Sequence, residues 1–181
     1  MKRFSLIVIA GIGVLVGIAA FMGSRLPRDH EVTMTATFRA PVEQVWAALS
    51  DVRAYPTWRT DVKSVTVLTP SPLTWSEDGS QGPMTFAVEA WQPPRRMVSR
   101  ITDEGQPFGG SWEYIVEPDT AEAGKTRVTI TENGWVSNPL FRFASKYVMG
   151  HYSGIDTYLR ALSKKFGPEM APSRVLVIGE R

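Results

Sequence analysis

Two titratable side chains in this 181-residue sequence, Glu132 and His151, occupy positions at which they could take part in chemistry. Glu132 shares its strand parity with Val128 and Ile130, and alternate residues of a strand lie on the same face. A carboxylate on that expected inner face is costly to bury without a partner, so Glu132 is a candidate general acid or base. The alternative is that the strand has already left the core and that Glu132 is solvated at its end.

His151 lies in the middle of the apolar face of the last predicted helix. Imidazole groups titrate close to neutral pH, so this side chain could bind the polar group of a ligand or transfer a proton. In the alternative interpretation, a neighbouring carbonyl or hydroxyl group satisfies its ring nitrogens. The other histidine, His30, is distant in the sequence, and neither histidine belongs to an H-E-x-x-H or similar metal-binding pattern.

Several classes of site are excluded or left without support by the composition. The sequence has no cysteine, which excludes a disulfide framework, a thiolate metal site and the ligands of a Rieske cluster. It contains no G-x-S-x-G elbow and no Walker loop. The net charge is only +2 and there is no basic tract with interleaved aromatic residues, so nucleic acid is not an expected partner. We therefore expect neither a metal nor a cofactor.

The N-terminal segment carries no charge from Phe4 to Ser24. At about 1.5 Å per residue, a helix of this length spans roughly 30 Å, the thickness of the hydrocarbon core of a bilayer. This predicts that residues 1–24 form a single-pass membrane anchor, with a cleaved signal segment as the alternative. Lys2 and Arg3 precede the apolar run, which favours a cytoplasmic N-terminus and a domain on the outer, periplasmic or extracellular side. Residues 25–30 would then be a linker.

Short strands separated by turns are predicted after the linker. Apolar and polar residues alternate from Val32 to Phe38, as expected of a strand with one buried face. Pro41 begins an amphipathic helix, which ends before the aromatic segment from Tyr55 to Trp58. Turn residues divide the next part of the chain into further antiparallel strands at residues 62–68, 71–77, 84–91, 96–102, 111–117 and 127–135.

The last predicted element is a long helix from Pro139 to Phe166, with Asn138 as its N-cap and Gly167-Pro168 at its end. Apolar side chains recur along it at spacings of three and four, which indicates one continuous apolar face. The tail, residues 168–181, is interrupted by prolines. The sequence does not decide between a disordered tail and one that pairs weakly.

The order of these elements resembles that of the SRPBCC superfamily, the START and Bet v 1-like helix-grip proteins. Tyr55-Pro56-Thr57-Trp58 with the strand after it is similar to the bacterial polyketide cyclase/dehydrase-like branch, and so is Thr126 to Glu132, which leads through Asn138-Pro139 into the last helix. The resemblance covers residues 31–167. It implies an α+β helix-grip fold, in which a curved antiparallel sheet of about seven strands wraps around a long C-terminal helix and leaves an apolar cavity.

The resemblance implies a class of function, because the superfamily includes cyclases, lipid carriers and receptors, but it does not assign an activity. We expect a membrane-anchored protein that binds a hydrophobic small molecule or lipid without catalysis. The candidate cavity residues are Trp112, Tyr114, Tyr147, His151, Ile155 and Tyr158. Two alternatives stay open: an aromatase/cyclase-type enzyme that uses Glu132 or His151 for proton transfer, and a protein-interaction module with a packed interior. The sequence does not indicate an oligomeric state.

Overall fold

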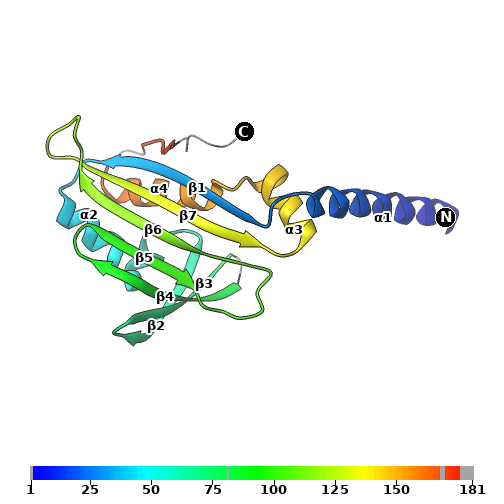
Figure 1. Cartoon of the computed structure of the whole chain (residues 1–181), viewed down its shortest axis with the longest axis horizontal. Coiled ribbons are helices and arrows are strands. Elements are labelled where there is room, and N and C mark those ends of the chain that lie inside the picture. The colour runs from blue at the N-terminus through cyan, green and yellow to red at the C-terminus, as the bar shows by residue number, and fades with distance from the viewer. Residues whose placement is uncertain (1, 81, 168–169, 176–181) are drawn as a thin grey trace.

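One curved antiparallel sheet wraps around the helix α4 (Ser153–Lys165), as Figure 1 shows. The computed structural model describes residues 2–80, 82–167 and 170–175. Over these residues the sheet has eight strands in the order β2-β3-β4-β5-β6-β7-β1-β8. The strands are β1 (Asp29–Phe38), β2 (Val62–Pro70), β3 (Leu73–Gly79), β4 (Gly82–Gln92), β5 (Arg96–Ile101), β6 (Phe108–Pro118), β7 (Thr126–Val136) and β8 (Ser173–Arg174).

The alternation of residue types determines which face of the sheet is buried. In β1, Val32, Met34 and Phe38 are buried, and β1 pairs with β7 so that Met34 lies opposite Ile130. The short helix α2 (Val42–Ser50) adds its own buried side chains to the same core. Apolar cross-strand pairs and helix contacts of this kind stabilise one face of the sheet, and the predicted α+β helix-grip fold is confirmed.

An eighth strand distinguishes the sheet from the predicted one of about seven strands. β8 pairs with β1, with Ser173 opposite Thr35 and Arg174 opposite Met34. The N–H of Val175 also donates to the carbonyl of Thr33. Residues 168–169 and 176–181 of the predicted tail lie outside the described residues.

The predicted C-terminal helix is not continuous. It consists of α3 (Pro139–Ala144), a π-helical turn η2 (Ser145–Met149) and α4, with Gly150 between η2 and α4. Gly150 has a φ of 79°, a left-handed conformation that no residue of a right-handed helix adopts. The prediction of one helix over residues 139–166 is therefore wrong at this point, and the two halves of its apolar face have different environments.

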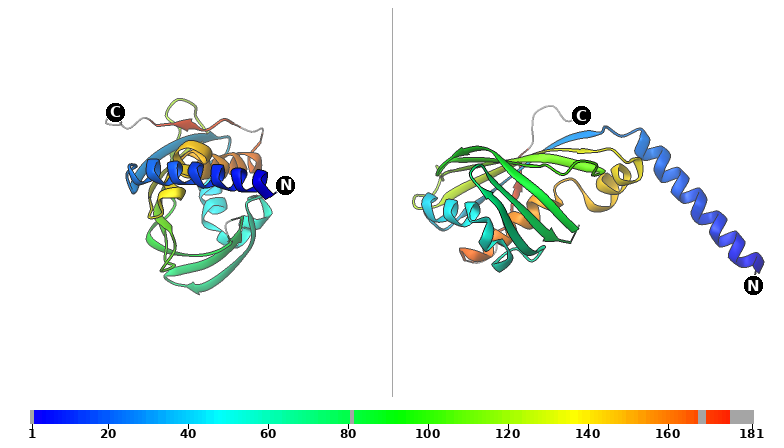
Figure 2. Two further views of the ribbon diagram at one scale, coloured as in Figure 1. Left: turned by 90° about the vertical axis from the view of Figure 1, so that its right-hand side faces the viewer. Right: turned by 90° about the horizontal axis from the view of Figure 1, so that it is seen from below.

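The N-terminal helix α1 (Lys2–Ser24) forms as a helix and extends away from the sheet (Figures 1 and 2). Its end packs against α3, because a Cβ atom on Gly23 would lie 1.8 Å from the carbonyl oxygen of Pro139. A membrane span needs about 20 consecutive apolar residues. Within the described part of the chain, no helix is both long and apolar enough to cross a bilayer. The prediction of a single-pass membrane protein with an outer domain is therefore wrong.

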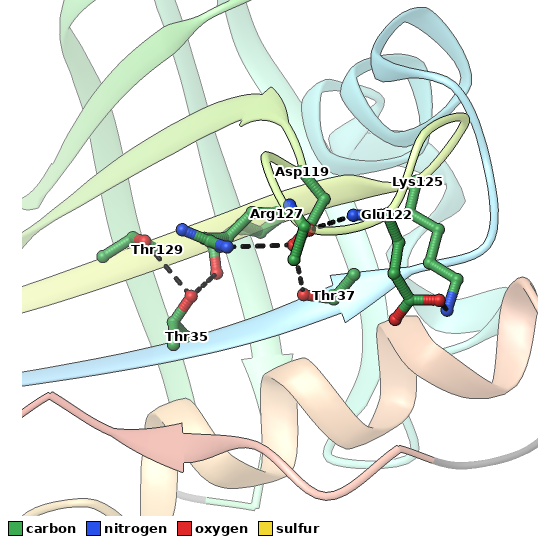
Figure 3. A network of polar contacts seen from close by, with 9 residues as sticks. Thr35, Thr37, Asp119, Glu122, Lys125, Arg127 and Thr129 are labelled. Carbon is green, nitrogen blue, oxygen red and sulfur yellow. Dashed lines mark hydrogen bonds and ion pairs between the residues drawn. The ribbon is translucent and has the colours of Figure 1, made fainter.

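Asp119 ties the turn between β6 and β7 to β1 (Figure 3). Its Oδ1 accepts hydrogen bonds from the N–H groups of Ala121 and Glu122, at 2.8 and 3.0 Å. Its Oδ2 accepts from Thr37 at 3.0 Å and from Arg127 at 3.1 Å. These donors, above all the N–H of Ala121, lower the pKa of Asp119 to about 2.

Candidate functional site

A groove of about 510 Å³ lies where the chain passes from α1 into β1. The junction between α1 and β1 forms one side, and α3, η2 and the residues before α4 form the other. Its volume falls within the range of about 300–1,000 Å³ that is usual for small-molecule sites. The lining residues are Leu26, Pro27, Arg28, Asp29, His30, Glu31, Val32, Val136, Arg142, Lys146, His151 and Tyr152.

Strand pairing brings His30 and Glu132 together at this groove. His30 lies opposite Gly134 and Val32 lies opposite Glu132, so His30 and Glu132 share one face of the sheet. Nε2 of His30 is 3.4 Å from Oε1 of Glu132, and each side chain is 16% exposed. A Cβ atom on Gly134 would lie 2.5 Å from the His30 ring, so the absence of a side chain there makes room for the imidazole.

The break after η2 places His151 against His30. The two ring centroids are 4.4 Å apart and the rings are tilted by 30°. On its other side, Nδ1 of His151 lies 3.1 Å from the hydroxyl oxygen of Ser145 in η2. One continuous series of contacts therefore runs from Glu132 through His30 and His151 to Ser145. The first and last contacts are polar, and the middle one is between the two imidazole rings.

This series of side chains has the composition of an acid–base site. Imidazole accepts or donates a proton near neutral pH, and a carboxylate or hydroxyl partner orients the ring. The half-buried surroundings keep the groups in contact while leaving the groove open to a ligand. No three His, Cys, Asp or Glu side chains are arranged to hold a metal ion in the described part of the chain.

Three cations also line the groove, and they lie on different elements. The guanidinium of Arg28 stacks on the ring of Trp135 at 4.9 Å. Arg142 in α3 donates from Nη1 to the carbonyl of Leu26 at 2.8 Å and so joins α3 to the start of β1. Lys146 in η2 is exposed. None of the three makes an ion pair with a carboxylate of the described residues.

The capping of α3 explains why this side of the groove forms. The Asn138 side chain accepts hydrogen bonds from the N–H groups of Leu140 and Phe141, and Pro139 occupies the first helical position. The predicted N-cap is therefore confirmed. It begins the helix immediately after β7, and this start places Arg142 and Lys146 beside the end of the sheet.

The six predicted cavity residues occupy three different environments. Tyr114, Ile155 and Tyr158 are buried between α4 and the sheet, and Trp112 is half-buried nearby. Tyr147 is 54% exposed. His151 is the one member of this set that lines the groove. Side chains that were expected to face one cavity are therefore divided between the core, the surface and the groove.

The space between α4 and the sheet contains a half-buried cation, Arg59. Nη2 of Arg59 lies 2.7 Å from Oδ2 of Asp61, and Nη1 lies 3.1 Å from Oε2 of Glu77. The guanidinium also lies 5.0 and 5.2 Å from the ring centroids of Tyr55 and Tyr158. Burial lowers the pKa of Arg59, but Asp61, Glu77 and Tyr158 raise it by more, so the guanidinium stays charged.

Aromatic side chains pack around this ion pair. The ring of Tyr158 lies 5.3 Å from Trp58 and 5.7 Å from Tyr114. Burial raises the pKa of Tyr114 to about 12, so its hydroxyl is protonated at neutral pH. Beyond the end of α4, a second cleft beside Phe166 has a volume of about 10 Å³, which is room for at most one water molecule.

Sequence reasoning missed His30 and Ser145. The signal for His30 was its parity, because it precedes Val32 by two residues and therefore lies on the inner face of the first strand. The position of His30 on the inner face identifies Glu132 as its neighbour only when the register between β1 and β7 is known. Ser145 carried no signal, since its contact with His151 depends on the break at Gly150.

The chain matches a protein-family model described as polyketide cyclase / dehydrase and lipid transport, over residues 29–162. A comparison with curated proteins gives no match. Solved structures with the same fold include a START superfamily protein from Mycobacterium smegmatis. Its TM-score is 0.61 and its sequence identity 18%, over 76% of this chain and 97% of that one.

Two further structures extend this comparison. An aromatase/cyclase from Streptomyces sp. R1128 has a TM-score of 0.62 and 17% identity, and the match covers 76% of this chain and 93% of that one. A conserved protein from Geobacillus kaustophilus has a TM-score of 0.63 and 17% identity, over 76% and 95% of the two chains. At such identities the likeness concerns the fold.

Proposed function

We propose, since the chain belongs to the polyketide cyclase/dehydrase and lipid transport family, that it binds a hydrophobic small molecule or lipid in the groove between the α1–β1 junction and α3. The observation that carries this proposal is the groove itself, with its volume of about 510 Å³. Ligand sites are typically concave and mostly apolar, with a few polar groups that orient the ligand.

The lining of the groove supports this function. Leu26, Pro27, Val32 and Val136 supply the apolar surface against which a hydrocarbon chain would pack. Removing such surface from water contributes roughly 25 cal/mol per Å², so the apolar wall would supply much of the binding free energy. The histidines and cations at the same groove would orient the ligand.

A titration with a fluorescent fatty-acyl probe tests the proposal on the full chain. We expect saturable binding to the wild type and an affinity at least about tenfold lower for Leu26→Trp, because the indole would occupy space in the groove and a loss of about 1.4 kcal/mol corresponds to tenfold. Leu68→Trp is the matched control, since Leu68 is exposed on β2 at the far end of the sheet. Binding that Leu26→Trp leaves unchanged would place the ligand elsewhere.

A second candidate function is acid–base catalysis of the aromatase/cyclase type. The contacts of Glu132 with His30 and of His30 with His151 favour it, because a carboxylate contacts one of the two imidazoles that line the groove. In that case His151→Gln and Glu132→Gln should each lower the turnover of a dehydrating cyclisation by roughly 10²-fold or more, with folding intact. If the wild type and both variants bind the probe but none of them shows turnover, the result favours the binding function over catalysis.

The third possibility is a protein-interaction module. The close packing of Arg59 with the aromatic rings of the interior is compatible with it. A wild-type protein that binds no apolar probe would count against both other functions and in favour of this one.

A further inference from the structure

We infer that the groove takes an amphipathic ligand with an anionic head, a carboxylate or a phosphate monoester, and that Arg142, Lys146 and His151 hold this head. The inference rests on the proposed binding function and specifies the class of its ligand. Its basis is that Arg142, Lys146 and His151 line the groove together with the apolar residues Leu26, Pro27, Val32 and Val136.

Arg142 is a half-buried cation whose charge no carboxylate of the described residues compensates. Its Nη1 donates to the carbonyl of Leu26 at 2.8 Å, and its Nη2 reaches the carbonyl of Ser137 at 3.4 Å. Its Nε is buried and has no hydrogen-bond partner in the described part of the chain. A guanidinium removed from water without a counter-ion is costly, so a bound anion would stabilise it.

Lys146 follows Arg142 by four residues, and both side chains line the groove. The Lys146 ammonium lies 5.8 Å from the ring centroid of Tyr147 and makes no ion pair with a described carboxylate. An exposed ammonium on a flexible stem can move to meet an anion without disturbing the fold. Arg142 offers fixed donors and Lys146 an adaptable one.

His151 adds a hydrogen-bonding group to the same groove. Its Nδ1 contacts the hydroxyl of Ser145 at 3.1 Å. When Ser145 donates to Nδ1, the ring proton lies on Nε2 and can be donated to a ligand oxygen. His151 thus complements the two cations as a hydrogen-bonding group.

The carboxylates at the groove do not cancel this charge. Asp29 and Glu31 also line the groove, but both are exposed and neither makes an ion pair with Arg142 or Lys146. Glu132 is in contact with His30. In the described residues, no carboxylate lies within ion-pair distance of Arg142 or Lys146.

The decisive measurement compares two fluorescent probes that share one acyl chain and differ only in the head, a carboxylate or a primary alcohol. Wild-type full-length protein should bind the carboxylate about tenfold or more tightly than the alcohol, the factor expected of one charge-assisted hydrogen bond. The preference should decrease as salt is raised, because salt screens exposed charges. An alkyl phosphate of the same chain length should behave like the carboxylate.

Lys146→Gln should weaken the binding of the carboxylate by severalfold more than that of the alcohol, since the exposed ammonium makes no ion pair with a described carboxylate and would act on the anionic head. His151→Gln should have the same direction of effect. Lys63→Gln is the control, because Lys63 is an exposed cation on β2, away from the groove.

Three results would contradict the inference, and they can be told apart. Equal affinity for the carboxylate and the alcohol would overturn the anionic head while the binding function stands. No binding of any of the probes would overturn the proposed function and this inference with it. A preference for the carboxylate that Lys146→Gln, His151→Gln and Lys63→Gln all leave unchanged would also overturn it.

Discussion

The imidazole ring of His30 lies against the ring of His151, with 4.4 Å between their centroids. β1 supplies one ring and the turn before α4 supplies the other, so this contact joins the sheet to the broken C-terminal helix inside the groove. A change that displaces either ring should therefore alter both the local packing and the shape of the ligand site.

Gly134→Ala is such a change. The new Cβ atom would lie 2.5 Å from Cε1 and Nε2 of His30, so the ring must move away from its present position and from His151. We expect the free energy of unfolding to fall by about 0.5–1.5 kcal/mol, the usual value of an aromatic pair, and the histidine ring signals in NMR spectra to shift. Urea unfolding gives the first quantity.

Gly154→Ala is the matched control for that experiment. A Cβ atom on Gly154 meets no atom within 4 Å, and the residue lies in the first turn of α4. Alanine should be neutral there or stabilise the protein by up to about 1 kcal/mol. Unchanged histidine signals in Gly134→Ala would contradict the ring contact.

Ile155→Trp separates an interior ligand site from the groove. Ile155 is 2% exposed and does not line the groove, so the larger side chain should overpack the core. The expected destabilisation is about 1–3 kcal/mol, with the affinity for the fatty-acyl probe unchanged as long as the protein is folded. Lost affinity with unchanged stability would instead indicate a ligand between α4 and the sheet.

Arg59→Met should be among the most destabilising substitutions in the chain. It leaves Glu77, which is 4% exposed, without its guanidinium partner, and the expected cost is about 3–5 kcal/mol. Adding Glu77→Gln should recover part of that loss in urea unfolding, because the double variant buries no charge at this position. If the double variant is less stable than Arg59→Met alone, Arg59 stabilises the protein through packing rather than through the ion pair.

Asp119→Asn should change the pH dependence of stability. The folded-state pKa of Asp119, about 2, is lower than its ordinary value of 3.8, so the ionised form stabilises the folded state. This contribution is present above about pH 4 and is lost as the pH falls towards 2. The difference in melting temperature between wild type and Asp119→Asn should therefore be largest above pH 4 and should decrease below it.

Glu104→Gln serves as the control for that comparison, since Glu104 is exposed in the turn between β5 and β6. Its melting temperature should follow that of the wild type across the same range. A melting-temperature difference for Asp119→Asn that does not change between pH 5 and pH 2 would contradict the role of the carboxylate.

The parts of the fold that were predictable depend on local patterns. The alternation from Val32 to Phe38 lies within β1, and the resemblance to the SRPBCC superfamily is confirmed by the family match over residues 29–162. The alternation of a strand and the capping of a helix each involve only a few neighbouring residues. Both signals can therefore be recognised from the sequence alone.

The site was less predictable because it depends on distant contacts. Gly150 fits a continuous apolar period, and only its φ of 79° reveals the break in the helix. His30 reaches His151 through the β1–β7 register and that break together. The uncharged N-terminal run likewise could not reveal that Gly23 packs against Pro139.

The two residues of β8 have a consequence for the behaviour of the chain at high concentration. They occupy the side of β1 that β7 leaves open, and the guanidinium of Arg174 lies 4.4 Å from the ring centroid of Tyr152, which holds this segment in place. An uncovered strand edge offers N–H and C=O groups to another chain and promotes aggregation. β8 therefore covers the open edge of β1 at Met34 and Thr35, and we expect a chain ending before Ser173 to associate more readily through this part of the edge.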